Sequence, residues 1–177
     1  MNALELLRSN ADHAAQEFRA SLEGVTQSQA WAVLPNLGPD YLHSDGSIHG
    51  IALHVAGCKR AYASICFRNT EIRWRDIADE IERFEPDWQA GVEYVEKAHA
   101  YWLESWSDLR DEDLEKLRPT NWAKPWPAWQ LLQLMSHHDS YHAGQIAVLR
   151  YGCADSDQPP PSVAEDVRKY CRESVHW

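Results

Sequence analysis

Two histidines four residues apart, His138 and His142, are the side chains in this sequence best placed to bind a metal ion. Four residues span about 400° of an α-helix, so side chains at this spacing project in the same direction from adjacent turns. Two imidazoles in that arrangement can bind one ion. The apolar residues that share this face are Leu131, Leu134, Met135 and Leu149. The pattern predicts that both histidines are buried, where imidazoles are costly without a partner such as a metal.

A third histidine, His54, lies on the apolar face of another predicted helix, which begins after Ser47 and runs to about Asn69. Three imidazoles from two helices would leave a fourth position of the metal open, as in catalytic zinc sites. Three imidazoles suit Zn, Ni, Fe and Cu alike. Of these we expect Zn or Ni, with Fe as the alternative. Cys58, one turn after His54, could reach the same ion, although a buried unreactive thiol is the commoner role.

Other histidines and acids give competing interpretations. His137 lies about 100° from His138 around the helix and is expected at the surface or rim. His99 follows an apolar stripe of tryptophans, which favours a core histidine bonded to a carbonyl or water over a proton shuttle near the metal. Asp139 occupies the position of the general base in the HExxH protease motif. We expect its side chain to point away from the centre of the protein, which argues against a protease.

Two further patterns are weaker. Glu96 with His99, and Glu173 with His176, fit the Glu-x-x-His element of di-iron carboxylate proteins, but none of the other candidate histidines has a companion glutamate. Lys59 is expected only to solvate a helix face.

Long amphipathic segments must position these side chains. Hydrophobic periodicity predicts four of them: Asn2–Gly24, Ser47–Asn69, Pro86–Leu109 and Leu131–Arg150, the last ending near Gly152. A short amphipathic helix, Trp74–Phe84, is predicted inside the connection between the second and third. The sequence therefore predicts an all-α four-helix bundle with a long crossover between helices 2 and 3. Residues 1–152 would form the bundle, and 153–177 a Pro-rich segment and a short helix that packs on the bundle or on a partner chain.

The composition of the chain limits the classes of partner that it is expected to bind. The formal net charge of -10 and the pI of about 5.3 argue against nucleic acid and anionic membranes as partners. The sequence has no apolar run long enough to span a membrane, and residues 1–10 lack the core of a signal peptide. The four cysteines show no CxxC spacing, so we interpret them as thiols of a cytoplasmic protein.

The run His138-Asp-Ser-Tyr-His142-Ala-Gly144-Gln145-Ile146, with Ser47–Gly57 upstream, resembles the DinB-like superfamily. That group includes bacillithiol and mycothiol S-transferases and mycothiol-dependent maleylpyruvate isomerases. The resemblance extends over the four long segments and is sharpest at these two motifs. It implies a metal site formed by His54, His138 and His142, and a homodimer. The tryptophan-rich loop Asn121–Trp129 and the tail after Gly152 depart from the family pattern.

The resemblance implies transfer of a low-molecular-weight thiol to an electrophilic small molecule, or a related hydrolysis or isomerisation. No residue stands out as the general base. The alternative is a non-catalytic metal-binding bundle of the stress response, in which the ion clamps two helices; a fourth ligand such as Cys58 would favour it. The loop Asn121–Trp129, together with Trp31, would form an apolar mouth for the electrophile, or would pack the end of the bundle or a dimer contact.

Overall fold

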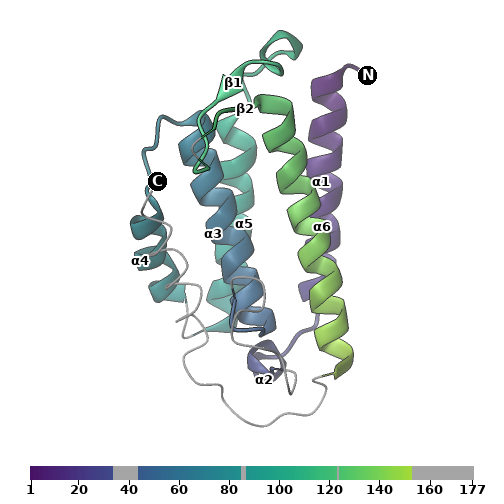
Figure 1. The fold of residues 1–177 in the computed structure, drawn as a ribbon. Helices are drawn as coiled ribbons and strands as arrows, with labels where there is room; N and C mark the ends of the chain where they lie inside the picture. The colour runs from purple at the N-terminus through teal and green to yellow at the C-terminus, as the bar shows by residue number, and fades with distance from the viewer. Residues whose placement is uncertain (34–43, 85–86, 123, 153–177) are drawn as a thin grey trace.

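Four long helices lie side by side in the computed structural model of the protein (Figure 1). They are α1 (Ala3–Leu22), α3 (Ile48–Phe67), α5 (Trp88–Ser105) and α6 (Ala128–Gly152). The structure describes residues 1–33, 44–84, 87–122 and 124–152. The predicted all-α four-helix bundle is confirmed, and the helix ends differ from the predicted ones by a few residues. The predicted segment 153–177 lies outside the described residues.

Side-chain caps explain where the long helices begin. Asn2 accepts a hydrogen bond from the backbone N–H of Glu5, and Glu5 accepts one from the N–H of Asn2, which forms a capping box at the start of α1. The hydroxyl of Ser47 accepts from the N–H of Gly50 at 2.9 Å and confirms Ser47 as the N-cap of α3. These polar residues satisfy backbone donors that a helix terminus otherwise leaves unpaired.

The long crossover between α3 and α5 contains the predicted short helix, α4 (Trp74–Phe84). Its apolar face packs against α3 at a glycine. A β-carbon added at Gly57 would lie 3.1 Å from Cγ2 of Ile77 and 3.3 Å from Cδ1 of Ile81. The small residue therefore allows α4 to approach α3 closely, and the crossover covers one side of the bundle.

Four short elements have no counterpart in the sequence prediction. They are the helix α2 (Gln27–Trp31), the 3₁₀ turn η1 (Asp111–Asp113), and the strands β1 (Leu117–Arg118) and β2 (Trp126–Pro127). The strands pair antiparallel, with Leu117 opposite Pro127. Elements of two to five residues are too short to show a hydrophobic period, so a pattern search misses them. The strand pair matters for the site because α6 begins directly after it.

Large apolar side chains fill the space between the helices. Trp102 and Trp106 are each 1% exposed, and their ring centroids are 6.2 Å apart. In the described part of the chain, no helix combines the length and the apolar character needed to cross a membrane.

Candidate metal centre

Three imidazole nitrogens converge between α3 and α6. The Nε2 atom of His138 lies 3.1 Å from Nε2 of His54 and 3.2 Å from Nε2 of His142. Ligand atoms of all three residues lie within 4.8 Å of one another. Zinc–nitrogen bonds of about 2.0–2.1 Å in tetrahedral geometry place neighbouring nitrogens about 3.3 Å apart. The two separations from His138 are therefore close to those around a tetrahedral ion, and the three histidines could hold a metal.

The three histidines differ in exposure. His54 is 4% exposed and His142 is 2% exposed, as the apolar stripes predicted. His138 is only partly buried. The prediction that His138 and His142 are both buried therefore holds fully for His142 and only in part for His138.

Gln145 fixes the orientation of one candidate ligand. Its Oε1 atom lies 2.7 Å from Nδ1 of His142. When Nδ1 carries the proton and donates it to Gln145, the lone pair of the neutral ring is on Nε2, the atom that faces His138. Partners of this kind hold a metal-binding histidine in the correct tautomer. In the sequence, Gln145 stood out only as part of the run that resembles the DinB-like superfamily.

Cys58 lies against His54 but outside the group of three ligand atoms. Its Sγ atom is 3.7 Å from Nε2 and 3.8 Å from Nδ1 of His54, and the residue is 3% exposed. Within the described residues, the group that could hold a metal consists of His54, His138 and His142. The arrangement corresponds to a three-histidine site and places the thiol beside it.

A buried ion pair lies beside the histidines and corrects two predictions. Nζ of Lys59 on α3 lies 2.6 Å from Oδ2 of Asp139 on α6, and each side chain is 2% exposed. Lys59 therefore does not solvate a helix face, and Asp139 does not point away from the centre. The reason is that α6 packs against both α1 and α3, so its buried arc is wider than one stripe. Burial lowers the pKa of Lys59 and raises the pKa of Asp139, and each charge opposes the shift of the other.

His99 belongs to this ion pair and has no described contact with the three histidines. Its Nδ1 atom lies 3.2 Å from Nζ of Lys59, and its Nε2 atom lies 4.0 Å from a carboxylate oxygen of Asp12. Burial, with the charges of Lys59 and Arg19, lowers the pKa of His99 to about 3. The ring is therefore neutral, and its Nδ1 atom accepts a hydrogen bond from the ammonium group of Lys59. The prediction of a core histidine is confirmed, but its partner is a lysine instead of a carbonyl or water.

The other candidates do not join the site. His137 is exposed, as predicted, and its Nε2 atom lies 3.4 Å from Nε2 of Gln133. Glu96 forms an ion pair with Arg19 at 2.6 Å, so the Glu96–His99 pattern does not assemble a di-iron element. The second such pattern, Glu173 with His176, lies outside the described residues.

Trp122, in the loop before α6, packs on α3, and Trp126 packs on Trp122. The ring of Trp122 lies 5.3 Å from that of Tyr62 and 4.8 Å from that of Trp126, measured between centroids. These contacts favour the interpretation that the loop packs the end of the bundle.

Comparison with known families gives one match. Residues 4–150 match the model of the DinB family, a range that includes all three histidines and nearly the whole of the four long helices. No curated protein and no solved structure gives a significant match.

Proposed function

Because the chain belongs to the DinB family, we propose that His54, His138 and His142 bind one divalent metal ion and that the site acts on a small molecule. The observation that carries this proposal is the convergence of three Nε2 atoms at separations of 3.1 and 3.2 Å. Neutral imidazoles are strong ligands for Zn and Ni, the metals we expect, and they also suit Fe. A bound divalent ion would lower the pKa of a water or thiol in its open position, and so supply a nucleophile near neutral pH.

Other features of the chain orient the three histidines and determine how exposed the site is. Gln145 holds His142 in the tautomer that presents Nε2. The Lys59–Asp139 pair joins α3 to α6, the two helices that carry the histidines. His138 is only partly buried and is the most exposed of the three histidines. These features support an open site in which a small molecule can reach the metal.

The reaction that we propose is the transfer of a low-molecular-weight thiol to an electrophilic carbon. With a halide as the leaving group, a carbon–sulfur bond forms, the carbon–halogen bond breaks, and the thiol proton passes to solvent. A related hydrolysis would use water in place of the thiol. None of the described side chains at the site is assigned as a general base.

A non-catalytic role is the second candidate, and one observation favours it. His54 is on α3 while His138 and His142 are on α6, so a bound ion would also join two helices of the bundle. In that case the ion would stabilise the fold. Its removal would lower the stability of the protein and would change no catalytic rate.

The ligand set is tested by elemental analysis of protein purified without a polyhistidine tag. We expect about one divalent ion per chain in the wild type and in His137→Ala, which changes an exposed histidine next to the site. His138→Ala and His142→Ala should each lose most of the metal. Full occupancy in His142→Ala would contradict the assignment.

The reaction is tested separately with an alkyl halide and a panel of cellular thiols that includes bacillithiol and mycothiol. Conjugate formation should be faster with the metal-loaded wild type than with metal-free protein or His138→Ala. Equal rates in the three samples, with the metal assignment upheld, would reject the transferase and favour the non-catalytic role.

A further inference from the structure

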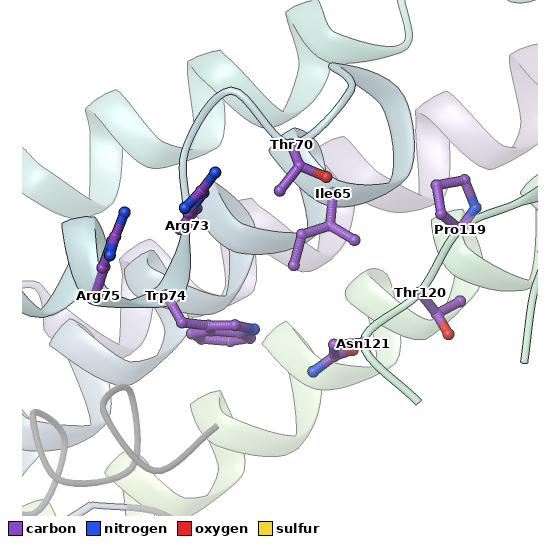
Figure 2. Close-up of a pocket in the computed structure, with 8 residues that line it drawn as sticks. All are labelled: Ile65, Thr70, Arg73, Trp74, Arg75, Pro119, Thr120 and Asn121. Atoms are coloured by element: carbon purple, nitrogen blue, oxygen red, sulfur yellow. The ribbon is translucent and has the colours of Figure 1, made fainter. Parts of the chain in front are cut away.

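A cavity of about 330 Å³ opens at the N-terminal end of α4, where the crossover meets the segment that leads into α6. Figure 2 shows the residues around it. Those that matter here are Ile65, Arg73, Trp74, Arg75, Pro119 and Asn121. We propose that this cavity binds a small aromatic anion, that is, a flat apolar body with a carboxylate or phosphate group. The proposal does not depend on the metal centre.

The charge of the cavity favours an anion. Arg73 and Arg75 line it, and among its described lining residues none is acidic. This local excess of positive charge occurs on a chain whose formal net charge is -10. Both arginines are exposed, so their guanidinium groups can reach a ligand at the mouth. The carboxylate of Asp76 caps the start of α4 by accepting from the N–H of Arg73 at 2.8 Å, and it lies 3.8 Å from Nε of Arg75. Arg73 is therefore the arginine of this cavity whose side chain has no acidic partner among the described residues.

The walls favour a flat apolar body. The indole of Trp74 is 4% exposed and is held edge-on by Tyr62, with ring centroids 6.2 Å apart. Ile65 and Pro119 supply apolar atoms from two other segments. The volume is at the small end of the range of ligand pockets, about 300–1,000 Å³, which fits one aromatic ring with a charged substituent.

Asn121 provides a second, independent indication of a ligand. The residue is 5% exposed, and in the described part of the chain its Oδ1 atom has no hydrogen-bond partner. Figure 2 shows its side chain pointing toward Trp74. Buried amide groups in folded proteins are nearly always hydrogen-bonded, so an unpartnered one beside a cavity indicates a missing partner. The unpartnered Oδ1 atom can only accept, so it fits a donor on the ligand such as a hydroxyl group, whereas the Nδ2 group of the same amide can donate to the anion.

The cavity is separate from the three histidines. Ile65 follows His54 by eleven residues on α3, which corresponds to about 16 Å along the helix. Tyr62 lies on α3 between these two positions, and the ring of Trp122 packs against it. An anion in the cavity therefore does not contact a metal held by the histidines.

The test is calorimetric titration of metal-free protein with benzoate and phenyl phosphate, so that neither probe can bind through a metal. At least one of them should bind, and neutral benzamide should bind at least about tenfold more weakly. Arg73→Gln should weaken binding about tenfold. Arg83→Gln makes the same charge change at an exposed position near the other end of α4 and should leave binding unchanged. Binding of neither anion, or equal effects of the two variants, would overturn the proposal.

Asn121→Leu separates binding from folding. If the amide serves a ligand, the variant should bind the anion more weakly while its melting temperature stays the same or rises, because an unpartnered buried polar group is replaced by an apolar one. A lower melting temperature with unchanged affinity would show that Asn121 serves the fold alone, and would overturn its assignment to a binding site.

Discussion

The ammonium group of Lys59 lies 2.6 Å from the carboxylate of Asp139, across the interface of α3 and α6. Each side chain is 2% exposed, so both charges are removed from water. The same two helices carry the three candidate metal ligands. A charge that loses its partner here cannot be solvated without opening the interface.

Lys59→Met and Asp139→Leu should each lower the free energy of unfolding by about 3–5 kcal/mol, because each leaves one buried charge unpaired. The double variant should recover much of this loss, since it leaves no charge. Urea denaturation measures the unfolding free energies of all three variants.

The control is Arg60→Met, which removes the cation of the Arg60–Glu80 pair. That pair has the same 2.6 Å separation, but its side chains are 20% and 22% exposed. We expect it to cost about 1 kcal/mol or less. Strictly additive single and double variants would contradict the pairing.

The pH dependence of stability should follow His49. This residue is 0% exposed, between the rings of Trp31 and Trp88. Burial lowers its pKa from 6.5 to about 4, against the opposing charge of Asp87. Between these two values the unfolded chain binds a proton at His49 that the folded chain does not. Stability should therefore fall as the pH drops from about 6.5 to 4, by up to about 3 kcal/mol from this residue.

The variant His49→Gln isolates that contribution. Unfolding free energies of both proteins, measured at several pH values with chelator present, should converge as the pH falls, because the wild type loses stability that the variant does not have. His99, whose pKa is lowered to about 3, contributes in the same direction in both proteins. Parallel pH profiles would show that His49 is not responsible.

Gln145→Ala should weaken metal binding by about 10–100-fold, because His142 then loses the acceptor that fixes its tautomer. Gln145→Glu keeps an acceptor oxygen and should bind more tightly than the alanine variant. Competition with a chromophoric chelator gives the affinities. Gln133→Ala, on the same helix but in contact with the exposed His137, should leave the affinity unchanged. Matching affinities for the two alanine variants would contradict the role of Gln145.

Removal of the metal should leave the helices folded. The four long helices bury enough apolar surface to persist without an ion, unlike a zinc finger. Far-ultraviolet circular dichroism should therefore be unchanged after chelation. The melting temperature should fall by about 2–4 °C for each kcal/mol of binding energy lost. Loss of helical signal on chelation would indicate a structural ion and would favour the non-catalytic role.

Local patterns in the sequence determined where the helices lie along the chain and on which helix face each histidine stands. The period of apolar residues placed α4 at its observed bounds, Trp74–Phe84, and the hydroxyl of Ser47 marked the start of α3. The spacing of His138 and His142 put both on one face of one helix. These features depend on contacts within a few residues along the chain, so the sequence contains the information needed to predict them.

Only the tertiary structure decided which buried groups meet. His54 and His138 are 84 residues apart in sequence, and their 3.1 Å contact depends on how α3 and α6 pack. Helical phase indicates that a side chain faces inward, but it does not identify the neighbour. Asp139 shows this most clearly. Its position on the helix predicted an outward side chain, but α6 packs against two helices, and Asp139 is buried against Lys59. The cavity beside Asn121 likewise arises where distant segments meet, and no local pattern specifies it.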